Sequence, residues 1–237
     1  MNYGTLYLIP CPISDETTPW EVLPASNRAI IEGLDYFIVE NTRTARRFLS
    51  KAGLSGRIEG LEFRELNEHT TAGVAIEELV QPLLEGRSAG VISEAGVPGV
   101  ADPGALVVEA AHRKGIRVVP LVGPSSIILA MMASGLNGQS FAFNGYLPIK
   151  PPERQRAIRR FERRAHEEGQ SQLFIEAPYR NRKLLDELLQ TLQPTTRLTV
   201  AMDLTAPGEW IRTCRVSEWR KMTLPDLQRR PAIFIIG

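Results

Sequence analysis

The hydrophobic positions in the first half of the chain gather into short, continuous apolar runs. These runs are TLYLI (5–9), YFIVE (36–40), AGVIS (89–93) and IRVVPLV (116–122), and FRELN (63–67), which mixes apolar and polar residues, could form a further strand. Runs of this length without polar alternation are typical of strands that are buried on both faces. We therefore expect strands that alternate with helices, which favours a parallel sheet whose ligands bind beyond the carboxyl ends of the strands.

The segments between these runs carry the spacing and the capping residues of helices. Helices are expected at about 26–33, 43–53, 71–84 and 103–114. Pro82 weakens the third prediction near its end, because proline removes a helical hydrogen bond. Asp102 is a candidate N-cap for the fourth helix, with Pro103 at the first helical position and Gly115 after the last.

The second half is richer in adjacent strands. Strands are expected within 141–148, 172–178, 197–205, 209–216 and 232–236, and helices at about 126–135, 153–168 and 181–192. This pattern predicts a mixed sheet. We place the boundary between Pro120 and Gly123, which gives two α/β domains, 1–120 and 121–237, with a mainly parallel sheet in the first.

Composition and charge narrow the function classes only slightly. The chain has 237 residues, 43% of them apolar, and a net charge of +1. An apolar fraction of this size is sufficient for hydrophobic cores, and a net charge near zero does not by itself indicate a nucleic-acid or membrane partner. No segment approaches the roughly 20 apolar residues of a membrane span, and the start shows no signal peptide, so a cytoplasmic protein is expected. Two distant cysteines and three scattered histidines provide no metal-ligand spacing.

The stretch GVISEAGVPGVADPG (90–104) carries the most distinctive chemistry. Its glycines would let backbone approach a ligand closely, and Glu94 and Asp102 could accept hydrogen bonds from sugar hydroxyls or balance a cation. The spacing matches neither G-x-G-x-x-G nor the phosphate-binding G-x-x-x-x-G-K-[ST] loop. A tight strand-to-helix connection with a good N-cap remains an equally simple interpretation.

This stretch resembles the S-D-A-G-T-P-x-x-S-D-P-G loop of the tetrapyrrole methylase superfamily. The resemblance is closest to the branch that methylates a ribose 2′-hydroxyl of small-subunit ribosomal RNA. Further segments resemble motifs of that branch in the same order: GTLYLIPCPI (4–13), VENTRT (39–44), LNEHT (66–70), VVPLVGPSS (118–126), FNGYLPIK (143–150) and IEAPYR (175–180). The likeness covers nearly the whole chain and weakens after about residue 205.

The resemblance implies a homodimer in which each chain holds S-adenosylmethionine (SAM) in a cleft between its two α/β domains. Carried over by position, the cofactor would contact residues from both domains. They are Pro10, Pro12, Ser93, Glu94, Gly96, Val97, Val100, Ala101, Ser125, Ser126, Tyr146, Ala177, Pro178, Met202, Ala232 and Ile233. No metal is needed for transfer of an activated methyl group from a sulfonium.

The acceptor side requires a hydrogen-bond acceptor, because a ribose hydroxyl is a weak nucleophile. Glu40, Arg43, Asn67 and Asp102 are the candidate catalytic residues, and Glu68 and Glu94 are further acidic candidates. Structural roles compete with these assignments. Asp102 could serve only as an N-cap, and Glu40 could simply pair with Arg43 or Arg46. His69 is more typical of a surface residue than of a base.

The segment PPERQRAIRRFERRAHEEG (151–169) places Arg156, Arg159, Arg160 and Arg163 on one helical face. Such a stripe would suit phosphate contacts, but we favour a solvated face that Glu153 and Glu167 partly neutralise.

Departures from the family motifs concentrate on the acceptor side. Asn41 stands where the branch has an acid, Val97 replaces a threonine, Tyr179 replaces a histidine, and the lysine of a late L-T-K-x-x-E segment is replaced by Ala206. Three functions therefore stay open. The chain could methylate a ribose of ribosomal RNA, methylate a small tetrapyrrole-like molecule, or bind SAM without turnover.

Overall fold

The computed structural model describes residues 3–66 and 76–237 of the chain. These residues form two compact units, Met1–Ser125 and Ser126–Gly237, which are called here the first and the second unit. Each has its own sheet and its own hydrophobic core, and each is described separately. No helix in the described ranges is long and apolar enough to cross a membrane.

The first unit is built on a parallel five-stranded sheet in the order β3-β2-β4-β1-β5. The strands are β1 (Thr5–Ile9), β2 (Tyr36–Val39), β3 (Glu62–Glu65), β4 (Ala89–Ile92) and β5 (Arg117–Pro120). All five strands expected in this half are therefore present, and the parallel sheet is confirmed. β2 and β4 are buried along their whole length, as expected for strands that are covered on both faces.

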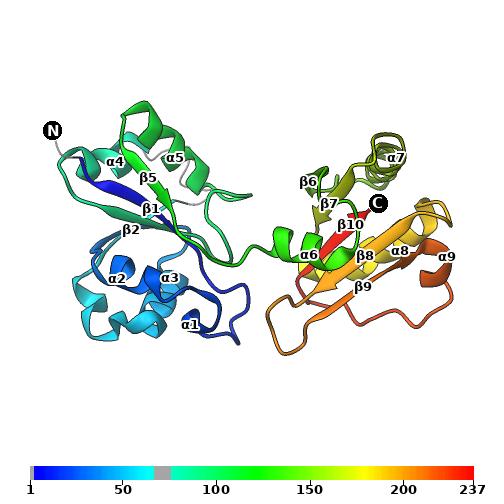
Figure 1. Cartoon of the computed structure of the whole chain (residues 1–237), viewed down its shortest axis with the longest axis horizontal. Coiled ribbons are helices and arrows are strands. Elements are labelled where there is room, and N and C mark those ends of the chain that lie inside the picture. The colour runs from blue at the N-terminus through cyan, green and yellow to red at the C-terminus, as the bar shows by residue number, and fades with distance from the viewer. Residues whose placement is uncertain (1–2, 67–75) are drawn as a thin grey trace. The chain divides into compact units, whose positions relative to one another are not determined.

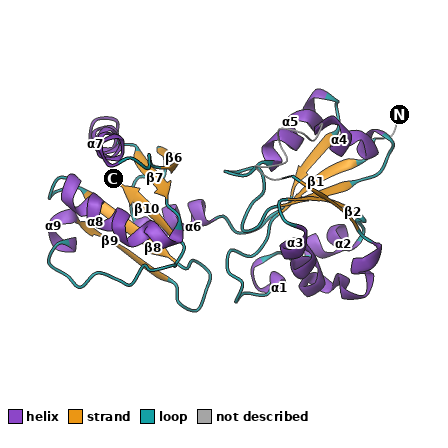
Figure 2. Cartoon of the chain, turned by 180° about the vertical axis from the view of Figure 1, so that it is seen from behind, coloured by secondary structure: helices purple, strands orange, loops and turns teal. Residues whose placement is uncertain are grey.

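Helices cover both faces of this sheet (Figures 1 and 2). The helices are α1 (Pro19–Val22), α2 (Ser26–Glu32), α3 (Thr42–Leu49), α4 (Ile76–Leu84) and α5 (Gly104–Arg113). α3 continues into a π-helical turn (Ser50–Leu54) and a 3₁₀ segment (Ser55–Gly60). One core packs α2 and α3 against the sheet, and another packs α4 and α5 against the opposite face.

β4 differs from its two neighbours in the sheet in the face that is covered by the helix following it. β1 and β2 lead into helices on one face of the sheet, whereas β4, which lies between them, leads into α5 on the other face. Connections that diverge in this way leave a crevice beyond the carboxyl ends of the strands. The loop after β4 lies at that point.

One predicted helix start is wrong by one position. α5 begins at Gly104 with Pro103 as its N-cap, because Asp102 and Pro103 belong to the preceding turn. α2 begins at Ser26, as expected. Pro82 does not end α4, which continues to Leu84. The predicted start of this helix at Thr71 lies outside the described residues.

The second unit carries a mixed five-stranded sheet in the order β6-β7-β10-β8-β9. Its strands are β6 (Phe141–Tyr146), β7 (Ser171–Ile175), β8 (Arg197–Met202), β9 (Trp210–Arg215) and β10 (Ala232–Ile236). β6 and β7 are parallel, and the remaining pairs are antiparallel. The mixed sheet predicted from the adjacent strands is confirmed.

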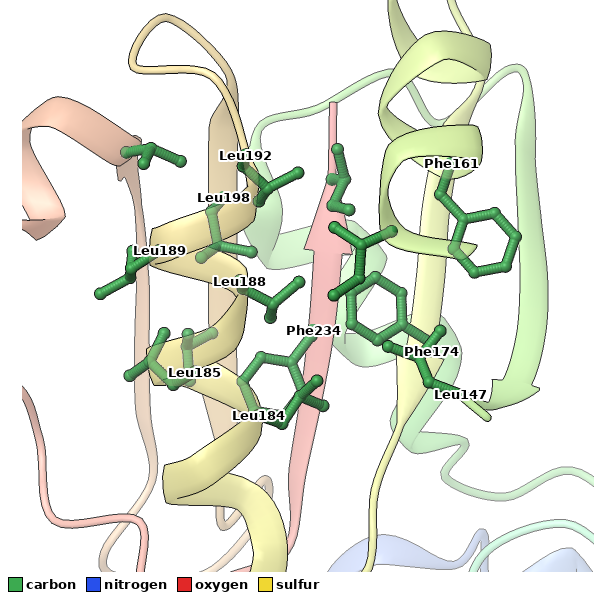
Figure 3. Close-up of a cluster of buried hydrophobic side chains, with 14 of the residues drawn as sticks. Leu147, Phe161, Phe174, Leu184, Leu185, Leu188, Leu189, Leu192, Leu198 and Phe234 are labelled. Carbon is green, nitrogen blue, oxygen red and sulfur yellow. The ribbon is translucent and has the colours of Figure 1, made fainter. Parts of the chain in front are cut away.

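Successive side chains of β10 point to opposite faces of the second sheet, and each face has its own hydrophobic core. Ile233 and Ile235 pack beneath α6 (Ser126–Ser134). Phe234 points to the other face, where it joins a larger core with α7 (Pro151–Glu168) and α8 (Asn181–Thr191). Figure 3 shows Leu184 and Leu188 of α8 on the side of the helix that faces Phe234, and the Phe234 ring stacks on the Phe174 ring with their centroids 6.0 Å apart. A short helix, α9 (Val216–Trp219), closes the end of this core.

The unit boundary falls after Ser125, whereas the sequence placed it at Pro120. The intervening residues are held by the first unit. Leu121 donates its amide to Leu8 O at 2.9 Å, and the Asn27 side chain donates to Val122 O at 2.8 Å. A Cβ on Gly123 would lie 2.3 Å from the Pro10 ring, so this segment is pressed against the end of β1.

Phe234→Ala tests the core of the second unit. Phe234 is fully buried in the central strand, so its truncation should lower the free energy of unfolding by about 3–5 kcal/mol. Urea unfolding followed by tryptophan fluorescence reports on this unit, because Trp210 and Trp219 contact each other there. Phe141→Ala on β6, where the ring is 36% exposed, is the matched control and should cost about 1 kcal/mol or less. Equal losses would contradict the assigned core.

Candidate functional site

The loop after β4 is pinned to both neighbouring strands. The Cys11 amide, just beyond β1, donates to Gly96 O at 2.8 Å. On the other side, the Glu94 amide donates to Glu40 Oε1 at 3.1 Å, and Glu40 directly follows β2. The carboxyl ends of β1, β2 and β4 therefore meet in this loop, as the sequence pattern predicted for a ligand site.

The loop keeps an unusual and partly exposed backbone. Gly96 and Gly99 have positive φ angles of 70° and 80°, and Ala101 adopts φ 57° without being glycine. Val100 is 47% exposed, and Glu94 and Ala101 are also exposed. A ligand can therefore reach this loop at Glu94, Ala95, Val100 and Ala101, whereas Ser93, Gly96 and Pro98 are buried.

Backbone strain is confined to two regions of the described chain. Besides Ala101, the other described non-glycine residues with positive φ are Asp203, Thr205 and Arg229. They follow β8 or precede β10, at the edge of the second sheet where SAM contacts were predicted. The Arg230 side chain ties these segments together by binding Asp203 Oδ2 and donating to Gly208 O. Strain of this kind persists where the surroundings enforce it, which is common at ligand sites.

Two carboxyl groups meet beneath the β4 loop. Asp102 Oδ1 accepts the amides of Gly104 at 2.6 Å and Gly99 at 3.0 Å. Asp102 Oδ2 is buried and has no hydrogen-bond donor among the described residues. Glu40 and Asp102 line the same small pocket. Burial, and then the hydrogen bond and the negative charge of Asp102, raise the pKa of Glu40 to about 7.

The surroundings of this pair explain the raised pKa. Glu40 and Asp102 share a small pocket with apolar residues from β2, β4 and the end of β3: Ile38, Val39, Leu66, Val91 and Ile92. Burial in such surroundings and the neighbouring charge of Asp102 both disfavour the ionised form of Glu40. The expectation that Glu40 pairs with Arg43 or Arg46 is wrong, because its described partners are Glu94 and Asp102.

A second pocket of the first unit opens beyond the ends of β1 and β4, beneath α3. It is lined by Cys11, Pro12, Ser14, Asp15, Thr17, Pro19, Thr44, Ala45, Arg47, Phe48, Lys51, Ser93 and Glu94. Arg47 binds Asp15 Oδ1 at 2.6 Å, and Lys51 donates to Asp15 O at 3.3 Å. Burial raises the pKa of the Cys11 thiol, so this sulfur stays protonated and is no nucleophile.

Asn41 explains one departure from the family motif. It is the N-cap of α3, and its Oδ1 accepts the amides of Arg43 at 2.9 Å and Thr44 at 3.2 Å. Asparagine caps a helix about as well as aspartate does, so the change at this position preserves the start of α3. Arg43 lies exposed in the first turn of that helix.

The predicted residues of the second unit also gather at one sheet edge. Tyr146 pairs with Ile175, Ile175 pairs with Ile233, and Ala232 pairs with Met202. Ala177 and Pro178 follow directly after β7. Met202, Ala232 and Ile233 are buried, whereas Tyr146 is 62% exposed. Side-chain contacts with a ligand at this edge therefore fall to Tyr146, Ala177 and Pro178.

The remaining predicted site residues lie outside the two groups described above. Ser125 ends the first unit, and Ser126 begins α6. Pro10 follows β1 and touches Gly123. Asn67, Glu68 and His69 lie outside the described residues. Within the described ranges, no cluster of three or more His, Cys, Asp or Glu residues could hold a metal ion.

Comparison with known proteins decides the family. The family model for Tetrapyrrole (Corrin/Porphyrin) Methylases matches residues 18–219. The chain belongs to this family. It is 30% identical to "Ribosomal RNA small subunit methyltransferase I" of Escherichia coli O157:H7, over 99% of the chain and 77% of that relative. The protein of the same name from Xylella fastidiosa is 31% identical, over 98% and 80%.

Solved structures share the fold of this methyltransferase. The uroporphyrin-III-C-methyltransferase of Thermus thermophilus superimposes with a TM-score of 0.55 at 21% identity, covering 99% of this chain and 92% of the other. The methyltransferase CobJ gives a TM-score of 0.62 at 18% identity, covering 99% and 94%. These likenesses support the architecture of the two sheets.

The methylase also holds its second-unit loops with residues that the motif comparison did not single out. Arg154 is 2% exposed and donates to Pro148 O and Ile149 O, both at 2.8 Å. Its guanidinium also lies 3.1 Å from Glu187 and 3.9 Å from Glu176. Glu176 in turn binds Arg180 at 2.6 Å. This network links the loop after β6 to the loop after β7.

A signal for Arg154 was present in the sequence. It precedes Ile158, Phe161 and Ala165 at the spacing of a single helix face. An arginine in line with the buried residues of a helix has to find internal partners. The candidate edge residues Tyr146, Ala177 and Pro178 flank the loops that it holds.

Proposed function

We propose that this methyltransferase uses SAM to methylate a ribose 2′-hydroxyl of small-subunit ribosomal RNA. The observation that carries the proposal is the Glu40–Asp102 pair beneath the β4 loop. It supplies a proton acceptor near neutral pH beside exposed backbone suited to the cofactor. The names of the relatives and the ordered motifs support ribosomal RNA as the acceptor.

The residues of the β4 loop fit a nucleotide-like cofactor. Gly96 carries no side chain but is buried, and its carbonyl accepts from the Cys11 amide, whereas Glu94, Ala95, Val100 and Ala101 are exposed. Ser93 Oγ already donates to Ala95 O at 3.2 Å, so it shapes the turn and keeps its lone pairs for a ligand donor. Pro10, Pro12, Glu94, Val97 and Val100 complete the proposed first-unit contacts.

When bound, SAM supplies an activated methyl group on a sulfonium. The protein has to hold the acceptor hydroxyl in line with it, which accounts for a large share of such rate enhancements. We infer that Glu40 takes the hydroxyl proton. Its carboxylate is about half ionised near pH 7, and a base whose pKa lies near the operating pH is the most effective one. Asp102 keeps that pKa high through its charge and its hydrogen bond.

The pocket beneath α3 suits a polyanionic acceptor. Arg43, Arg47 and Lys51 follow one another at intervals of four residues and therefore lie along one side of the α3 segment. Arg47 and Lys51 line the pocket, which begins at Ser93 and Glu94. We propose that these cations contact phosphates next to the target ribose, with Arg43 nearest to Glu40 in the chain.

The resemblance also implies a homodimer, which stays a prediction. An apolar residue on the outer side of α6 is consistent with it, since Met132 is 75% exposed.

Gly96→Val tests the cofactor loop. The backbone at Gly96 has φ 70°, a conformation that a β-branched residue adopts only with strain. We expect SAM affinity, measured by calorimetric titration, to fall at least about tenfold, since even about 1.4 kcal/mol of distortion has that effect. Gly138→Val is the control, because open space surrounds that glycine at an ordinary φ. Unchanged affinity in Gly96→Val would remove Gly96 from the cofactor site.

The pH dependence of methyl transfer tests the base. The rate should rise with pH through about 7 as Glu40 ionises. Glu40→Gln should remove this rise and lower the rate about 100-fold or more, because general bases contribute on that scale. Asp102→Asn keeps an Oδ1 acceptor for Gly99 and Gly104 but removes the neighbouring charge, so the rise should move to lower pH.

Glu109→Gln is the control for these variants, since Glu109 is exposed on α5 and pairs with Arg113. A profile in Asp102→Asn that coincides with that of the unaltered enzyme would show that Asp102 does not tune the base.

The acceptor itself is tested with labelled SAM. Label should pass to small ribosomal subunits from cells that lack this protein, and mass mapping should place the methyl group on a ribose. Label that enters only a tetrapyrrole pool would replace the RNA proposal with a small-molecule methyltransferase. SAM binding without label transfer to either pool would leave a binding protein.

A further inference from the structure

Helix α7 uses its charges differently on its two faces. On the inner face, Ile158 and Phe161 pack into the core of the second unit. Two charged residues are buried with them, and both have internal partners. Arg154 binds the loop carbonyls described above, and Glu162, 5% exposed, accepts from Thr196 Oγ1 at 2.5 Å and from the Gln193 amide at 2.7 Å.

The outer face carries Arg156, Arg159, Arg160 and Arg163, which are all exposed and are called here the arginine face. In the part of the chain that the structure describes, none of these four forms an ion pair. Their neighbour Arg164 does pair, with Glu168 at 3.7 Å. The neutralisation by Glu153 and Glu167 that the sequence suggested does not take the form of direct contacts. The Arg160 guanidinium lies 5.2 Å from the centroid of the Phe161 ring, and the charges of Arg156, Arg159 and Arg163 are directed to solvent.

The arginine face borders a groove. Arg159 and Arg163 line it together with His166 on α7 and with Thr191 and Gln193 at the end of α8. The acid at its base, Glu162, is already engaged by Thr196 and Gln193, which leaves Glu167 as the exposed acid among the lining residues.

The carbonyl groups at the end of α8 are also neutralised. Arg220 donates to Leu189 O at 2.8 Å and to Leu192 O at 3.0 Å. These bonds offset the negative end of the α8 dipole, which would otherwise repel an anion from the groove. The groove thus has Arg159 and Arg163 in its lining, and the Glu162 carboxylate beside them is already engaged by Thr196 and Gln193.

We propose that the arginine face and its groove bind the phosphate backbone of the RNA substrate. The inference rests on the proposed function and adds an anchoring surface to it, since none of the candidate site residues lies on α7. Arg156 to Arg163 spans about 10 Å along the helix, at about 1.5 Å per residue. That length matches several phosphates of one strand, which advance by about 3.4 Å each. Guanidinium groups bind phosphate oxygens through paired donors.

The test compares two triple variants that remove the same charge. Arg156→Gln/Arg159→Gln/Arg163→Gln alters the arginine face. Arg113→Gln/Arg164→Gln/Arg182→Gln alters exposed helix arginines that each form an ion pair four residues along the helix. Binding of a labelled RNA stem-loop is followed by fluorescence anisotropy, without SAM, from about 50 to 200 mM KCl, because phosphate contacts appear in the salt dependence.

The arginine-face variant should lose about 2 units of slope in log K against log [KCl], and bind about 100-fold more weakly near 0.1 M, since each phosphate contact contributes about 0.7–0.9 to the slope. The control should keep the slope of the unaltered protein. With small ribosomal subunits as substrate, KM should rise in the arginine-face variant while kcat and SAM affinity hold. Unfolding followed by tryptophan fluorescence verifies that both variants fold.

An unchanged slope in the arginine-face variant, or equal weakening in both variants, would overturn the inference. Methylation of ribosomal subunits with an unchanged KM would overturn it while leaving the proposed function standing. If no subunit is methylated but RNA binding still depends on the arginine face, the proposed function fails and this inference holds.

Discussion

The candidate site depends on two hydrogen bonds that fasten the β4 loop to its neighbours. The Cys11 amide holds Gly96 O on the side of β1, and Glu40 holds the Glu94 amide on the side of β2. Strand order makes this possible, because β4 lies between β1 and β2 and departs to the opposite face. With both sides fixed, the loop can keep the strained conformation at Ala101 that its own sequence would not maintain.

The hydrogen bonds that hold the β4 loop also place Glu40 beside Asp102, and this arrangement lowers the free energy of unfolding. In an unfolded chain the pKa of a glutamate is about 4.3, whereas in the fold the pKa of Glu40 is about 7. Between these values the folded chain binds more protons than the unfolded chain. The unfolding free energy therefore falls as pH rises through this window. The strands β2 and β4, which precede Glu40 and Asp102 in the chain, are fully buried, and their burial offsets this loss of stability. Such compensation is expected where a strained arrangement serves a ligand site.

The elements that the sequence predicted well are those specified locally. Each strand expected in the first half is present within two residues of its predicted bounds, and continuous apolar runs give the fully buried strands β2 and β4. The start of α5 was predicted less accurately, because Asp102 accepts the amide of the first helical residue, Gly104, without being the backbone N-cap of the helix. The motif likeness placed Tyr146, Met202 and Ile233 together, and strand register explains why they meet.

Contacts between residues far apart in the chain could not be predicted in this way. Nothing local to Glu40 indicates that Asp102 will lie against it, because that proximity depends on the order of β2 and β4 in the sheet. The two faces of α7 show the same limit. Arg154 and Arg159 are the same residue type on one helix, yet the first is enclosed by carbonyl groups and carboxylates whereas the second faces solvent beside a groove. A buried arginine with complete partners stabilises the fold, but the exposed arginines have no such role. Their concentration on one face, beside a groove in which Glu162 is already engaged by Thr196 and Gln193, is better explained by an anionic ligand than by the packing of the helix.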